Sequence, residues 1–356
     1  MSRDKSIDRL RGFAMLWVIV VHVLYWGDFY TGDCANLVKS FCLFEMPLFF
    51  FITGAANSFS RVTGYFKFVI KRFQRILVPY WVFALICAAL SIVKYKLEGP
   101  MDFAAAGNVL LSWMIPTDNQ MTSVSYLILA LWFVPVYLCV VPVIPVLKSM
   151  KQSAHKIGFG FLQAGVFAAA CLLNMGWIRN VLFYALWTYL GLFYSEIKAA
   201  VCQKRGRKVL ACIAAAGALM LCMLSFAGCP LDMQKNKFPP NMIFLVFSAA
   251  MMAVILMALP YLNSTFEKLE KYRIGNKILT MYSNRSMTIF LYQAFAFHIS
   301  VRLAELLVPG AGAVAATIKS LICLVTTIPI CAGLAMVFGK IEDIGIKTSK
   351  EAQKTA

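Results

Sequence analysis

The sequence predicts an all-α integral membrane protein, with about ten transmembrane helices in a single bundle and both termini in the cytoplasm. Three observations predict this fold. Of the 356 residues, 61% are hydrophobic and only 14% are charged, and the mean hydropathy of +0.74 is too high for a surface that meets water. Apolar runs of roughly 20 residues, the length that crosses a bilayer, fill most of the chain. Lys and Arg gather in the short segments between these runs.

The apolar runs give the expected spans in order. They cover approximately residues 13–30, 37–59, 76–95, 125–147, 157–175, 180–197, 209–226, 241–262, 286–301 and 311–338. The first run has a basic flank like a signal peptide, but it is long and lacks a small-x-small cleavage site, so we expect it to remain as a span. Another stretch, 103–115, is too short to cross and is expected to lie at the outer interface or to re-enter.

The distribution of positive charge predicts the orientation. With the N-terminus inside, 26 of the 34 Lys and Arg residues fall in cytoplasmic segments. The strongest contributions come from 61–75, 198–208, 268–285 and the tail from 340. A net charge of +18 would suggest nucleic acid as the partner of a soluble protein, but orientation in a cell membrane, inner or plasma, explains it here. We expect membrane lipids around the chain and no nucleic acid.

Nothing in the sequence divides the chain into separate domains. It has no clear internal repeat, and its loops are of ordinary length, so we predict one membrane domain over 1–340 and a cytoplasmic tail over 341–356. The 11 cysteines are scattered and form no C-x-x-C pair. The sequence therefore predicts no metal site.

Arg11 and His22 are the most informative polar pair. Eleven residues of helix make about three turns and rise about 16 Å, so the two side chains share one face. His22 is then expected near the middle of the bilayer, where an ionisable group is costly and is a candidate for function. The alternative is a histidine whose hydrogen bonds are satisfied by a neighbouring helix.

Glu45 lies inside the second apolar run and should face the interior of the protein, paired with a cationic or polar group. Two interpretations are equally open: Glu45 orients His22, or it is the structural partner of another buried donor.

Arg72 and Arg75 lie at positions i and i+3 before the third run, so both guanidinium groups can bind one anion. A basic cluster at this point is also what membrane orientation alone requires.

Several motifs together resemble the membrane acyltransferase 3 family, which includes O-acetyltransferases of cell-surface glycans and fucose 4-O-acetylase-like proteins. Residues 7–22, IDRLRGFAMLWVIVVH, are similar to its first-helix signature of Arg, ten residues and His. Residues 46–54, MPLFFFITG, and the RFQR of 72–75 before PYW match two further motifs in the family order. Weaker similarities at 131–134, 237–240 (KFPP) and 284–292 extend the resemblance over nearly the whole chain. Family members often carry His where this chain has Glu45 and Gln293, so the acceptor side of the site is expected to differ.

The resemblance implies transfer of an acyl group, in the simplest case acetyl, from acyl-CoA to a hydroxyl of a cell-surface or lipid-linked glycan. It implies that Arg72 and Arg75 bind the CoA phosphates of the co-substrate acetyl-CoA. His22 would act as general base or carry the acyl group transiently. Arg11 would support His22 or stabilise developing negative charge, and Glu45 would fix the imidazole tautomer. The acceptor, the acyl group, the side of transfer and the oligomeric state stay open.

Two other classes of function compete with this one. A proton-coupled transporter or flippase for a lipid-linked sugar or small polar solute would also use buried His and Glu side chains. Transporters often show paired broken helices in two related halves, and this chain shows no such symmetry. A structural subunit of a glycan-synthesis complex would tolerate replacement of His22.

Overall fold

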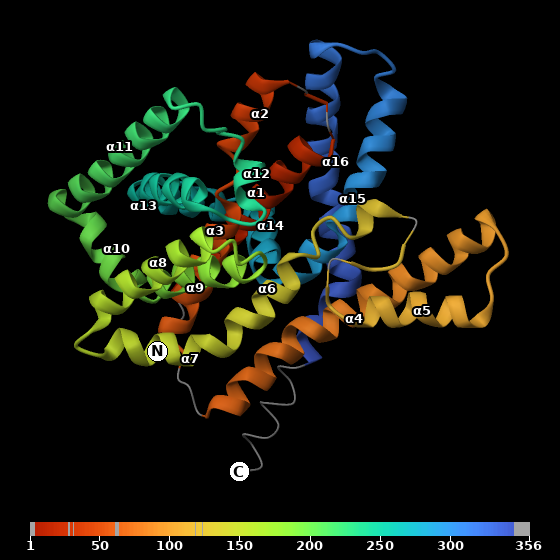
Figure 1. The fold of residues 1–356 in the computed structure, drawn as a ribbon. Helices are drawn as coiled ribbons and strands as arrows, with labels where there is room; N and C mark the ends of the chain where they lie inside the picture. The colour runs from red at the N-terminus through yellow and green to blue at the C-terminus, as the bar shows by residue number, and fades with distance from the viewer. Residues whose placement is uncertain are drawn as a thin grey trace. The chain divides into compact units, whose positions relative to one another are not determined.

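The computed structural model describes residues 4–27, 29–30, 32–60, 64–117, 119–122 and 124–344. Within these residues the chain forms helices joined by turns and no β-strand, as predicted (Figure 1). In the part of the chain that the structure describes, seven helical segments are long and apolar enough to cross a membrane. They are Cys34–Ser58, Tyr65–Glu98, Phe133–Gln152, Lys204–Phe226, Met242–Lys271, Ser286–Leu307 and Ala313–Asp343. The count of ten crossings and the cytoplasmic position of both termini stay predictions, and the tail beyond 344 lies outside the described residues.

The chain divides into two compact units, which we describe separately. Unit 1 comprises Met1–Val62 and Pro142–Ser283, and unit 2 comprises Thr63–Val141 and Asn284–Ala356. The helices of unit 1 are α1 (Lys5–Trp26), α2 (Asp33–Ser40), α3 (Glu45–Ser58), α7 (Ile144–Gln152), α8 (Lys156–Leu172), α9 (Ile178–Leu192), α10 (Tyr194–Cys202), α11 (Lys204–Phe226), α12 (Met233–Lys237), α13 (Met242–Lys271) and α14 (Arg273–Asn284, whose last residue begins unit 2).

Close contact between α3 and α9 forms the centre of unit 1. Gly54 of α3 faces the Thr188 carbonyl of α9, and Gly191 of α9 faces the Phe51 carbonyl of α3. A Cβ atom at either glycine would clash with that backbone, so the helices approach this closely only because both positions lack a side chain. The C-terminal end of α3 is fixed by Lys148, whose Nζ donates to the carbonyl of Asn57 at 3.1 Å.

Unit 2 is built on a long helix. Its helices are α4 (Tyr65–Glu98), α5 (Phe103–Met114), the 3-10 turns η1 (Ser125–Leu127), η2 (Val141–Val143, which ends in unit 1) and η3 (Gly339–Asp343), and α6 (Phe133–Val140), α15 (Ser286–Leu307) and α16 (Ala313–Phe338). In Figure 1, α5 folds back along α4 and α15 lies beside α16. At about 1.5 Å per residue, the 34 residues of α4 reach about 51 Å and exceed the roughly 30 Å hydrocarbon core.

The predicted apolar runs are largely helical, but their boundaries differ from those of the helices. The second run, 37–59, is divided between α2 and α3, and the fourth run, 125–147, among η1, α6, η2 and α7. The third run was expected to begin at 76, whereas α4 begins at Tyr65 because a helix continues into its polar flank without interruption. The run at 180–197 is interrupted, since α9 ends at Leu192 and α10 restarts the helix at Tyr194. The short stretch at 103–115 forms α5, a 12-residue helix too short to cross, which agrees with the prediction.

Candidate functional site

Arg11 and His22 lie on one uninterrupted helix, α1, as the sequence predicts. The Arg11 guanidinium lies 3.6 Å from the Asp8 carboxylate one turn earlier. The imidazole of His22 stacks on the indole of Trp26, with ring centroids 3.9 Å apart and ring planes at 8°. Both side chains are partly exposed, while the face of α1 between them is buried. The two groups therefore lie at different positions along the same helix.

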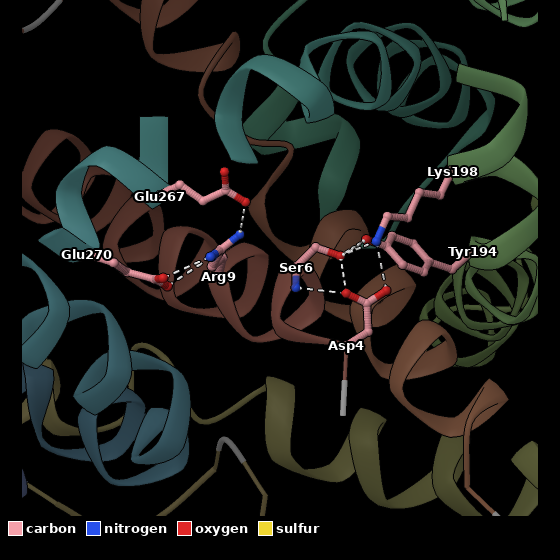
Figure 2. Close-up of polar contacts among 7 residues, drawn as sticks. All are labelled: Asp4, Ser6, Arg9, Tyr194, Lys198, Glu267 and Glu270. Atoms are coloured by element: carbon pink, nitrogen blue, oxygen red, sulfur yellow. Dashed lines mark hydrogen bonds and ion pairs between the residues drawn. The ribbon is translucent and has the colours of Figure 1, made fainter. Parts of the chain in front are cut away.

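A polar network fixes the N-terminal end of α1 to α10 (Figure 2). Asp4 caps α1 by accepting from the Ser6 backbone N–H at 2.9 Å. Lys198 donates from Nζ to Asp4 Oδ2 and to Ser6 Oγ, each at 2.9 Å. The Ser6 hydroxyl also lies 2.6 Å from the Tyr194 hydroxyl. Burial alone would raise the pKa of Asp4, but the hydrogen bonds from Ser6 and Lys198 outweigh it and place that pKa below its usual value.

A second contact fixes the same end of α1 to α13. Arg9 binds Glu270 through two parallel hydrogen bonds, Nε to Oε1 at 2.9 Å and Nη2 to Oε2 at 2.8 Å (Figure 2). Its third nitrogen, Nη1, donates to Glu267 at 2.9 Å. All three guanidinium nitrogens therefore hold the helix in place. These contacts were not predicted, because they join residues about 260 positions apart in sequence.

The middle of α1 packs against the start of α3. Trp17 donates from Nε1 to the carbonyl of Cys42 at 2.9 Å, and its ring stacks on Phe44 at a centroid distance of 5.1 Å. The backbone at Gly12 lies close to that of Leu279 in α14, where a Cβ atom would stand 2.9 Å from the carbonyl oxygen. These contacts set the register between α1 and Glu45, the first residue of α3.

Glu45 is buried and paired with a cation, as predicted. Lys237, the last residue of α12, donates from Nζ to Glu45 Oε1. The two side chains are only 3% and 4% exposed, so this is a wholly buried ion pair. The second carboxylate oxygen, Oε2, is buried and has no hydrogen-bond partner. Of the two interpretations of Glu45, the structure supplies the buried donor, and a role of Glu45 toward His22 stays a prediction.

Lys237 is the residue of this site that the sequence did not single out. It appeared only within the KFPP similarity and among the few positive charges expected outside the cytoplasm. A signal was available: a lysine that orientation does not require, next to two prolines, in a chain whose second apolar run holds a carboxylate that needs a partner.

Arg72 and Arg75 lie on α4 in unit 2, one turn apart as predicted. The Arg72 guanidinium lies 5.4 Å from the centre of the Phe68 ring. Arg75 is exposed and, among the described residues, makes no ion pair. Arg285 in the same unit is neutralised by Asp343, with hydrogen bonds of 2.8 and 2.6 Å. Arg75 is therefore exposed and outside any close ion pair, although its charge acts on Glu342, whereas Arg285 is held in an internal pair.

Comparison with protein families decides the relationship. The model of the acyltransferase domain matches residues 4–336, nearly the whole chain. The chain belongs to the acyltransferase 3 family. Comparison with curated proteins and with solved structures gives no match. The family and the apolar helices together indicate a multi-pass membrane acyltransferase. Among the described residues of this family member, no three His, Cys, Asp or Glu side chains form a metal-binding group.

Proposed function

We propose that this protein is a membrane-embedded O-acyltransferase that moves an acyl group, in the simplest case acetyl, from acyl-CoA to a hydroxyl of a cell-surface or lipid-linked glycan. The match to the acyltransferase 3 family over residues 4–336 carries the proposal. The matched segment includes all five residues to which we assign roles, which are Arg11, His22, Glu45, Arg72 and Arg75. Glu45 is proposed to fix the tautomer of the His22 imidazole, and the other four roles follow.

His22 is the proposed general base. Its neutral imidazole takes the proton of the acceptor hydroxyl while the hydroxyl oxygen attacks the thioester carbonyl. The carbon–sulfur bond then breaks, and the leaving thiolate takes the proton from the imidazolium, so the products are an ester and free CoA. Stacking on Trp26 restricts rotation of the ring and holds it ready for this transfer. Attack by His22 itself, giving an acyl-histidine, is the second possible route.

Arg72 and Arg75 are the proposed binding residues for the phosphates of CoA. Guanidinium groups form charge-assisted, paired hydrogen bonds with phosphate oxygens. Positions i and i+3 place both groups on one side of α4, and the exposure of Arg75 leaves it accessible to a ligand. Arg11 is proposed to support the His22 face of α1 or to stabilise negative charge on the reacting carbonyl oxygen.

The proposal is tested by following released CoA thiol from purified protein in lipid nanodiscs with acetyl-CoA, succinyl-CoA and cell-envelope glycan. Wild type should release CoA and label the glycan. His22→Ala should lower turnover about 10²-fold or more, the usual contribution of a general base. Trapping of a labelled acyl-protein in wild type, lost in His22→Ala, would favour the acyl-histidine route.

A separate experiment tests the proposed binding of acyl-CoA by Arg72 and Arg75. Arg72→Ala/Arg75→Ala should raise the half-saturating concentration of acyl-CoA by about tenfold or more, because hydrogen bonds to charged groups are lost. Lys67→Ala is the matched control, since it removes an exposed positive charge from the same helix and should change little. No CoA release by wild type, combined with movement of a lipid-linked sugar across vesicles, would replace the enzyme with the transporter. Full activity of His22→Ala would favour the structural subunit.

A further inference from the structure

The buried pair of Glu45 and Lys237 stands at the ends of two helices in unit 1. Glu45 begins α3 and Lys237 ends α12, so loops rather than mid-helix segments adjoin the pair. The helix N-terminus favours the negative charge of Glu45, and Lys237 balances it. Neighbouring elements are tied together here, as shown by the 2.9 Å hydrogen bond from the Met233 backbone N–H of α12 to the Ser40 hydroxyl of α2.

One atom of this pair is unsatisfied. Lys237 binds Oε1, whereas Oε2 of the same carboxylate is buried without a donor. Leaving a buried acceptor unpaired costs about 1–3 kcal/mol, and more for a charged group. Native structures pair nearly all such atoms, so an exception needs an explanation, either a ligand that binds there or an ordered water.

A second polar atom near the pair is also unsatisfied. The hydroxyl of Tyr25, from α1, is buried and faces Ser40 without a hydrogen bond of normal geometry. The charge of Glu45 acts on Tyr25, on Cys42 and on Tyr184 of α9, so these groups lie within electrostatic range of the carboxylate that Lys237 binds.

His22 belongs to the same region of α1. It precedes Tyr25 by three residues, which places both on one face of the helix about 4.5 Å apart along its axis. Tyr25 therefore shares a helix face with the proposed general base, and the charge of Glu45 also acts on it. Asp232 is the N-cap residue of α12, and its charge also acts on Tyr25.

The chemistry of the pair selects the kind of ligand. A carboxylate oxygen only accepts hydrogen bonds, so the ligand must bring a donor. Because the positive charge of Lys237 already balances Glu45, the pair offers no net charge to attract a phosphate or a carboxylate. A hydroxyl group is a neutral donor that fits both Glu45 Oε2 and the Tyr25 hydroxyl.

We infer that Lys237 is a positioning residue of the acceptor site: it holds Glu45 by one carboxylate oxygen and so presents the other to a hydroxyl of a polyhydroxylated acceptor. The inference rests on the proposed acyltransferase function and adds where the acceptor binds. Glu45 touches the acceptor and Lys237 acts through Glu45. Lys237 thereby affects how tightly the glycan binds and not how tightly acyl-CoA binds.

The test must separate this role from simple support of the fold. Removing one member of a buried pair leaves an uncompensated charge, whereas replacing both by apolar residues of similar size is often neutral for stability. Glu45→Leu/Lys237→Met is therefore the decisive variant, and Glu45→Gln/Lys237→Gln is a second form that keeps a neutral hydrogen bond. Lys235→Met is the matched control, because Lys235 lies on the same short helix with an 80% exposed side chain.

Each variant in nanodiscs is measured for thermal melting, for release of CoA with and without cell-envelope glycan, and for half-saturating amounts of glycan and of acetyl-CoA. In the folded double variant we expect a rise of about tenfold or more in half-saturating glycan, the loss of one hydrogen bond to a charged group. The half-saturating concentration of acetyl-CoA should not change. Lys237→Arg keeps the cation, so the half-saturating amount of glycan for this variant should stay near that of wild type.

The outcomes are distinct. A stable double variant with unchanged glycan dependence would overturn the inference and assign Oε2 to a structural water only, while leaving the acyltransferase function in place. Equal losses in glycan and acetyl-CoA dependence would also overturn it, because the pair would then support the whole site. Absence of CoA release by wild type would reject the proposed function itself.

Discussion

The charged side chains near the two ends of α1 differ in their burial and in how completely they are hydrogen-bonded. At the N-terminal end, Asp4 and Arg9 are bound by partners on α10 and α13 that remain partly open to solvent. Every oxygen of the Arg9–Glu270 pair accepts a hydrogen bond. Toward the other end, Glu45 and Lys237 are almost wholly buried, and one carboxylate oxygen has no partner. A satisfied, half-exposed network positions a helix, whereas a buried pair with one unsatisfied oxygen is costly, and this cost is the basis of the acceptor site inferred above.

The largest expected effect comes from breaking the buried pair on one side only. Lys237→Met should destabilise the protein by about 3–5 kcal/mol, because Glu45 is left buried without its cation. Lys198→Met, the matched change at the other end, should cost about 1 kcal/mol or less, since Lys198 is 41% exposed. Thermal melting of both variants in nanodiscs checks the difference. Equal losses of stability in the two variants would show that burial does not make the Glu45–Lys237 pair more important than the Asp4–Lys198 pair.

A smaller loss is expected from crowding the α3–α9 contact, which supports the helix that carries Glu45. Gly54→Ala should cost about 1–3 kcal/mol, because the new Cβ meets the Thr188 carbonyl and the helices must separate. Gly165→Ala on α8 adds the same methyl group in open space and should be neutral or slightly stabilising. The comparison uses melting temperature, and a neutral Gly54→Ala would contradict the close approach of α3 and α9.

Sequence patterns predicted the parts of this arrangement that depend on local order. The spacing of Arg11 and His22 was enough to place them on one face of one helix, and burial of Glu45 with a cationic or polar partner followed from the cost of a charge in an apolar run. The identity of that partner did not follow. Lys237 is 192 residues away on a five-residue helix, and hydropathy carries no signal for which loop cation folds back onto which span.

Helix boundaries show the same division. Hydropathy marks where the bilayer can begin, not where the helix begins, and so α4 extends to Tyr65 before its apolar run. Hydropathy also missed α14, because its mixed polar and apolar composition is typical of an amphipathic helix and not of a span. The contact of α14 with Gly12 of α1 depends on the three-dimensional fold.

At the N-terminal end of α1, the hydrogen bonds of Arg9 predict which of its two glutamate partners contributes more to stability. Glu270→Gln should cost about 1 kcal/mol, because it removes the charge from a pair joined by two parallel hydrogen bonds. Glu267→Gln should cost about half as much or less, since Glu267 accepts one bond and is 62% exposed. Melting temperatures of the two variants decide the order. The reverse ranking would mean that the two glutamates do not bind Arg9 in the way described.

The smallest effect concerns pH at Asp4. Since the folded pKa of Asp4 lies below its unfolded value, its contribution to stability is present above about pH 4, the unfolded pKa of an aspartate, and is lost as the pH falls through the lower folded pKa. Asp4→Asn keeps the helix cap but removes the charge that binds Lys198. Melting of wild type should therefore approach that of Asp4→Asn as the pH falls from about 6 to about 3, with a difference of at most about 1 kcal/mol at the upper end. A gap that widens on acidification would reverse the sign and contradict the ion pair with Lys198.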